Sequence, residues 1–177
     1  ELFVRVSGSP GLGGNETDDA NNNSPEALDN IRSFWPKEAD TADQEYKKNV
    51  LSVVQERLKY FSELPELTTF FFTEPSIDIS LIDNNKQLKK VEKNRLKELL
   101  EISMLKLTDS DFTADDVQER LNSLLEETGE KPAVLFSIIR VATTWKASSP
   151  QLNETLAVLG RETTLNRLTR SINYFKD

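Results

Sequence analysis

Few residues in this sequence of 177 residues could perform chemistry, because it contains no cysteine and no histidine. The commonest general base, the thiolate nucleophile and the usual nitrogen and sulfur ligands of transition metals are therefore absent. The acids Asp109, Asp111, Asp115 and Asp116 suggest a calcium loop, but its turn glycine and terminal glutamate have no matching positions. We expect neither a metal site nor catalytic residues, since carboxylates alone would have to perform any reaction.

Charge is unevenly distributed along the chain. The formal net charge is −8, yet the residues from Lys131 to the end contain seven basic and three acidic side chains, a local balance of +4 that leaves −12 for the first 130 residues. A basic face on an acidic protein could bind nucleic acid through phosphate contacts. A solvated surface with uneven charge explains the pattern equally well.

Residues 1–40 are predicted to be a loop-rich, partly flexible segment. Residues 7–24 contain Gly, Pro, Asn and Asp with almost no apolar side chains, so they cannot offset the entropy of ordering. Residues 1–6 alternate like a strand that lacks a partner. A short helix could run from Ser24 to about Phe34, where Trp35-Pro36 stops it.

The first convincing helices are predicted between residues 41 and 75, a first helical subdomain. From Thr41, apolar residues recur at helical spacing as far as Phe61, which predicts an amphipathic helix of about five turns. A further helical piece should follow Pro65 and end in the aromatic run Phe70-Phe71-Phe72. We expect this run to be core rather than a stacking surface, because exposed aromatic clusters are costly.

A linker and a long helix are predicted for residues 76–112. The stretch 74–85 has turn residues at both ends and is typical of an extended connection between two subdomains. Apolar residues recur at helical spacing from Lys86 to Leu107. Many Lys/Glu pairs three or four positions apart in this helix suggest a solvated outer face.

Residues 113–177 are predicted to form a C-terminal helical subdomain. Thr113 to Asp116 resembles a capping box with Asp in place of Glu, and the helix that it opens should stop at Gly129. Pro132 is expected to begin the next helix, since proline favours the first helical position.

Two more helices should complete this subdomain. Ser149-Pro150 is expected to start a short helix that stops at Gly160, and a last helix follows. Helices joined by short connections, without a fixed repeat, predict an all-α bundle or cage of two small subdomains.

A specific pattern occupies the sequence from Leu135 to Ile172. An arginine is followed by a Ser-Pro-x-Leu turn, a Leu-Gly-basic-Glu step and an Arg-Leu pair. These residues are Arg140, Ser149-Pro150-Gln151-Leu152, Leu159-Gly160-Arg161-Glu162 and Arg167-Leu168. In order and spacing the pattern resembles the C-terminal end of bacterial-type glutamyl-tRNA synthetases. A weaker match, Gln55 to Leu64 followed by the aromatic run, is similar to the segment that opens the family's anticodon-binding region.

The resemblance implies the class I synthetase anticodon-binding fold and recognition of tRNA(Glu), with tRNA(Gln) left open as a second partner. In the family a separate nucleotide-binding domain attaches glutamate to tRNA with ATP and Mg²⁺. We expect that catalytic half to be absent here, because one signature needs two histidines and its Lys-Met-Ser-Lys loop cannot be placed at Met104, the only methionine. This chain alone is expected to be inactive and to need no cofactor.

The resemblance also implies RNA-contacting residues around the Ser-Pro turn. Arg140 is implied to stack on or hydrogen-bond an anticodon base, and Ser149, Pro150 and Leu152 are implied to lie at the first anticodon base. Without the resemblance, Arg140 would be interpreted as half of an ion pair with an acid such as Glu154 or Glu162. Ser149-Pro150 would be an ordinary helix start, with the serine as cap.

Further candidates come from both matched blocks. Arg57 and Lys59 are candidates for reading the third anticodon base. The family's usual Thr-Gly step is Thr-Trp here, and Lys146 follows, which makes the loop more basic. Trp145 could stack on an unpaired base, worth about 1–3 kcal/mol, or be an interhelical core residue.

Arg167 and Arg170 lie one helical turn apart and are plausible contacts to the RNA backbone, or a solvated basic face. The rival function is a helical protein-interaction adaptor without RNA affinity, which only the acidic total charge favours. An Asn-rich insertion in a bacterial-type synthetase suggests the mitochondrial matrix as its location. We expect a monomer that binds neither DNA nor membranes.

Overall fold

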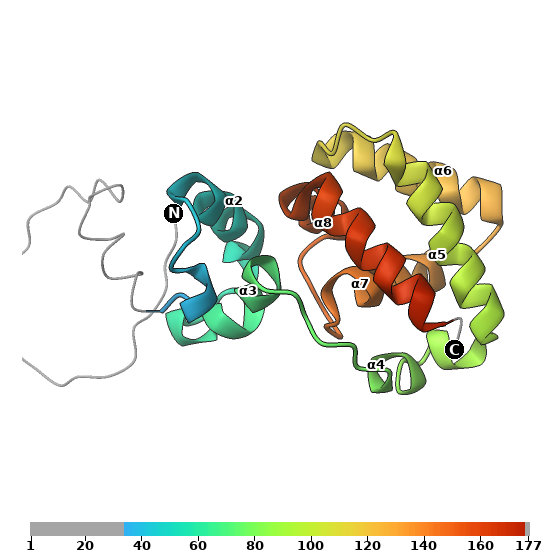
Figure 1. Ribbon diagram of the computed structural model, residues 1–177, viewed down its shortest axis with the longest axis horizontal. Helices are drawn as coiled ribbons and strands as arrows, with labels where there is room; N and C mark the ends of the chain where they lie inside the picture. Colours follow the sequence, from blue (N-terminus) through green and yellow to red (C-terminus); the bar gives the residue numbers. More distant parts are fainter. Residues whose placement is uncertain (1–33, 176–177) are drawn as a thin grey trace, which may run out of the picture. The chain divides into compact units, whose positions relative to one another are not determined.

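The computed structural model describes residues 34–175, which form helices and no strand within that range (Figure 1). The predicted all-α fold is confirmed. The chain divides into two compact units, the first ending at Phe72 and the second beginning at Thr73. The expectations for residues 1–6, for the loop 7–24 and for the helix that follows it lie outside the described residues. Between residues 34 and 175, no helix is both long and apolar enough to cross a membrane.

The described part of the first unit consists of two α-helices and three short 3-10 turns. These are η1 (Lys37–Ala39), α2 (Gln44–Val54), η2 (Gln55–Arg57), η3 (Phe61–Glu63) and α3 (Leu64–Phe72). Asp43 caps α2 by accepting a 2.7 Å hydrogen bond from the backbone N–H of Tyr46. This cap is the local reason why the helix begins there.

The predicted five-turn helix is wrong at its C-terminal end. Helix α2 stops at Val54, and the backbone is extended at Leu58. The Glu63 carboxylate accepts hydrogen bonds from the backbone N–H groups of Lys59, at 2.9 Å, and Tyr60, at 3.4 Å. These bonds cap a new helical start instead of continuing the old one.

The aromatic run at the end of α3 is core, as predicted. Phe70 and Phe71 are buried. Phe72 packs edge-on against the rings of Trp35 and Tyr46, with centroid distances of 5.5 and 5.7 Å. The Tyr46 hydroxyl donates a 3.0 Å hydrogen bond to the carbonyl of Phe71, which ties α2 to α3.

The second unit is a bundle in which α8 packs against α5, α6 and α7 (Figure 1). Its elements are α4 (Ser80–Asp83), η4 (Leu88–Lys90), α5 (Lys93–Thr108), α6 (Ala114–Thr128), α7 (Pro132–Thr144) and α8 (Leu152–Tyr174). Leucine and isoleucine side chains at helical spacing fill its interior. Among the fully buried ones are Leu96, Leu99, Leu100, Leu107, Leu121, Leu124, Leu135, Ile138 and Ile139.

Several helix ends lie where local signals predict them. The Thr113 hydroxyl accepts from the backbone N–H of Asp116 at 3.2 Å and caps α6, which ends at Gly129 with φ at +62°. Pro132 is the first residue of α7. Gly160 interrupts α8 with φ +77° and ψ 169°, a backbone region that is essentially restricted to glycine.

Two predictions between residues 74 and 107 are wrong. The expected extended linker contains α4, whose Ile82 is buried and which packs on α7 and η4. The long helix begins at Lys93 rather than Lys86, because the preceding residues form the separate turn η4 around buried Leu88. Helix α5 then packs on α6, α7 and α8, so residues 76–112 do not stand apart from the C-terminal helices.

Candidate nucleic-acid interface

The turn between α7 and α8 is held by Arg140 and Ser149. Arg140, partly exposed near the end of α7, donates from Nε to the Ser149 hydroxyl at 3.0 Å. That hydroxyl in turn donates to the carbonyl of Pro150 at 3.0 Å, and Ser149 is only 3% exposed. The expected helix start at Ser149-Pro150 is therefore wrong: the serine is occupied, and Gln151 is the cap residue before Leu152.

Besides Ser149, three more of the expected contact residues in this turn are buried. Trp145 is 5% exposed and adopts φ +45° at the end of α7. Its indole ring is therefore a core group, and the alternative of stacking on a base does not fit this geometry. Pro150 and Leu152 are also buried, so their role is to support the conformation of the turn. Lys146 is partly exposed, so it and Arg140 are the turn's remaining basic candidates.

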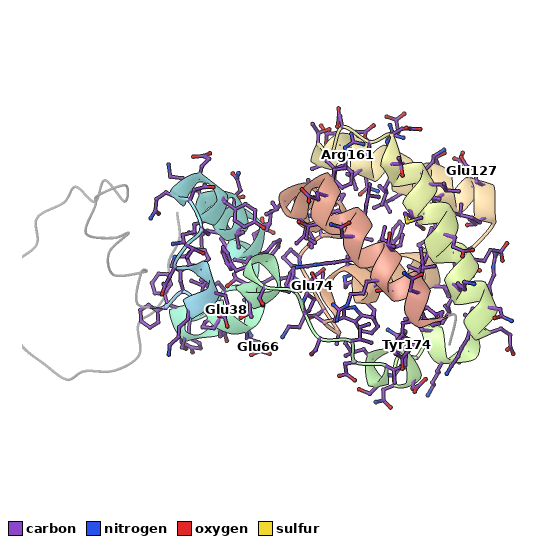
Figure 2. All side chains as sticks on the ribbon, viewed as in Figure 1. Glu38, Glu66, Glu74, Glu127, Arg161 and Tyr174 are labelled. Carbon is purple, nitrogen blue, oxygen red and sulfur yellow. The ribbon has the colours of Figure 1, made fainter. Side chains whose placement is uncertain are left out.

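Arg167 has a structural role in the second unit. Its guanidinium, 3% exposed, donates to the Glu74 carboxylate at 3.0 Å and to the carbonyls of Thr143 at 2.8 Å and Thr73 at 3.0 Å. Arg170 shares Glu74, labelled in Figure 2, at 2.6 Å and is more exposed. The predicted common face is confirmed, but burial removes Arg167 from the residues that could reach an RNA backbone. Sequence reasoning missed Glu74, because it lies more than ninety positions away.

Arg161, labelled in Figure 2, makes contacts within the second unit. It donates to the carbonyls of Thr108 and Ser110 at the end of α5 and lies 5.6 Å from the centre of the Phe112 ring. Asp116, in the first turn of α6, accepts a hydrogen bond from the Ser110 hydroxyl, and its pKa lies below its ordinary value chiefly because Arg120 donates to it at 2.8 Å.

Arg57 and Lys59 lie at the same pocket of the first unit. Both are exposed, and with Glu63, Glu66 and Leu67 they line an open pocket of about 240 Å³. The Glu63 carboxylate in this pocket is fixed by the two backbone N–H groups described above.

Tyr60 is an exposed aromatic residue that sequence reasoning missed. It follows Lys59 directly, and 46% of its surface is accessible. The available signal was an aromatic residue next to two basic ones, Arg57 and Lys59, since aromatic and basic side chains together are typical of surfaces that bind single-stranded nucleic acid.

Comparison with known proteins places the chain in a family. The family described as anticodon binding domain matches residues 26–172. Glutamate–tRNA ligase of Bacillus licheniformis is 35% identical over 134 residues, which are 75% of this chain and 26% of the relative. The Bacillus subtilis enzyme is 33% identical over 133 residues, with 74% and 26% covered. The chain thus spans about a quarter of the length of these relatives.

Solved structures agree with the fold. A crystal structure of a glutamate tRNA ligase from Elizabethkingia meningosepticum aligns with a TM-score of 0.65 at 19% identity, over 82% of this chain and 28% of that one. The resemblance expected from the C-terminal pattern is thereby confirmed. The chain belongs to the anticodon-binding domain family.

Proposed function

We propose that this chain recognises the anticodon loop of tRNA(Glu) as the anticodon-binding part of a glutamate–tRNA ligase. The relatives with this name, aligned over three quarters of the chain, support the proposal. Anticodon bases are unpaired and splayed outward, so they are read by base edges and stacking rather than through a groove. In the whole enzyme, cleavage of Mg²⁺-bound ATP would supply the energy for attaching glutamate, and this chain would select the tRNA.

The observation that carries the proposal is the arrangement of Arg140. Its guanidinium is planar and always charged, and its Nε bond to Ser149 fixes the orientation of that plane at the α7–α8 turn. An oriented, partly exposed guanidinium can stack on a base or donate to base acceptors. Buried Pro150 and Leu152 keep the turn in shape, and Lys146 adds a positive charge beside it.

The pocket of the first unit is proposed to read the third anticodon base. Arg57 and Lys59 supply donors, whereas the fixed carboxylate of Glu63 supplies an acceptor. If the base in this pocket is a cytosine, its pairing edge presents both acceptors and an amino donor, which such a mixed set of donors and an acceptor can bind. Whether tRNA(Gln) is accepted as well would be decided by this contact.

Arg140→Ala tests the function directly. We expect the variant to lose about 1–3 kcal/mol of binding to the cognate anticodon stem-loop, about 5- to 150-fold in Kd, and to discriminate less against a mismatched loop. Arg170→Ala removes an equal charge from a residue that pairs with Glu74 and remains a candidate backbone contact, so it should leave the discrimination between the two loops unchanged. Both loops are titrated alongside a melting curve of each variant. Unchanged discrimination by a folded Arg140→Ala protein would contradict the assignment.

The remaining expectations stay predictions. The Asn-rich segment behind the mitochondrial location lies outside the described residues. A monomeric state can be checked by sedimentation, and the tRNA(Gln) question by titrating the matching stem-loop.

A further inference from the structure

Four exposed lysines lie within eight consecutive residues of a chain that is acidic overall. We call Lys86, Lys89, Lys90 and Lys93 the lysine cluster. Residues 86–97 hold six basic side chains against the single acid Glu92. The pairs that suggested a solvated, self-neutralised face form only downstream, as Arg95–Glu98 and Lys97–Glu101. Within residues 34–175, no ion pair involves a member of the cluster.

The backbone that carries the lysine cluster is firmly held. Leu88, the first residue of η4, is fully buried and lies in the sequence between the exposed Lys86 and Lys89. The Asn85 side chain accepts from the backbone N–H groups of Gln87 at 2.9 Å and Leu88 at 3.1 Å. The turn also packs on α4 and α7, between α4 and α5 in Figure 1. The backbone positions of the four lysines are therefore fixed by the packing and hydrogen bonding of the turn.

The first turn of α5 lacks the acidic residues that usually stabilise the N-terminal end of a helix. The helix begins with Lys93 and has Glu92 as a cap whose side chain makes no capping hydrogen bond. The N-terminal end of a helix carries partial positive charge, so a lysine there is unfavourable for folding. A local conflict of this kind is expected at functional sites rather than on an ordinary surface.

We propose that the lysine cluster binds the phosphodiester backbone of the tRNA whose anticodon the chain reads. The proposal rests on the proposed function, which supplies the RNA. Phosphates complement four exposed lysines beside a positive helix end, and such contacts fix orientation without reading sequence. The cluster therefore contributes affinity and salt dependence, whereas the anticodon residues contribute discrimination.

The experiment measures the salt dependence of binding to whole tRNA(Glu) transcript. Lys89→Gln/Lys90→Gln should lower the slope of log affinity against log salt by about 1.4–1.8, because each phosphate contact contributes about 0.7–0.9. Cognate and mismatched anticodons should be weakened alike. Lys47→Gln/Lys48→Gln removes the same charge from α2 and should leave the slope unchanged.

Lys93→Glu supplies a second, opposite readout. Replacing a lysine by an acid at the helix start should raise Tm by about 1–4 °C while RNA binding weakens. A higher Tm with unchanged binding would overturn the proposal, as would an unchanged slope in the double variant. If the wild-type chain discriminates between anticodons but the cluster variants bind as it does, only the lysine cluster is refuted. Failure of the wild-type chain to bind any RNA would refute the proposed function as well.

Discussion

Replacing Arg167 by methionine tests whether this residue is structural or touches RNA. The side chain is 3% exposed and makes hydrogen bonds to Glu74, Thr143 and Thr73. Glu74 is 52% exposed and can turn to water, whereas Thr143 is fully buried. Leaving the buried Thr143 carbonyl without a hydrogen-bond donor should cost about 1–3 kcal/mol of stability, and losing a hydrogen bond to a charged group costs a similar amount.

Because these terms overlap, we expect Arg167→Met to destabilise the protein by about 3 kcal/mol, or about 6–12 °C in Tm. Arg170→Met is the matched control, since that side chain pairs with the same Glu74 but is 39% exposed. An exposed ion pair is worth about 0–1 kcal/mol, so the control should melt within a few degrees of wild type. Urea and thermal unfolding measure both. An Arg167→Met protein of normal stability that binds RNA more weakly would refute the structural role.

Two further predictions concern helix ends. Gly160→Ala should cost about 1–3 kcal/mol, because φ +77° with ψ 169° strains any other residue although open space surrounds the added methyl. Gly129→Ala, at φ +62° and ψ 14°, should destabilise the protein less than Gly160→Ala, because other residues tolerate the left-handed helical region better. A larger loss of unfolding free energy in Gly129→Ala than in Gly160→Ala, measured by urea unfolding, would contradict this. The pKa of Asp116 is lower in the folded protein than in the unfolded chain. Ionised Asp116 therefore contributes its full stabilisation above its pKa in the unfolded chain, and this contribution is lost as the pH falls through its pKa in the folded protein. Asp116→Asn should therefore flatten the decline of stability below about pH 4, and an equally steep decline in unfolding curves would rule out this origin.

The sequence alone determined the features that depend on neighbouring residues. Thr113 caps its own helix, Gly129 and Gly160 supply backbone conformations that other residues resist, and Pro132 fits a first helical position. Helical spacing likewise predicted the all-α fold. These interactions span a few residues, so the unfolded chain already favours them.

Only the tertiary structure decided how side chains with several possible partners are used. Ser149 can cap a helix, but Arg140 engages its hydroxyl, and α8 therefore begins later. Trp145 can stack on a base, but the bundle buries it. Arg167 can bind phosphate, but Glu74, more than ninety residues away, holds it. In each case a contact made only in the folded bundle gave the side chain more hydrogen bonding or burial than the role that its local sequence suggested.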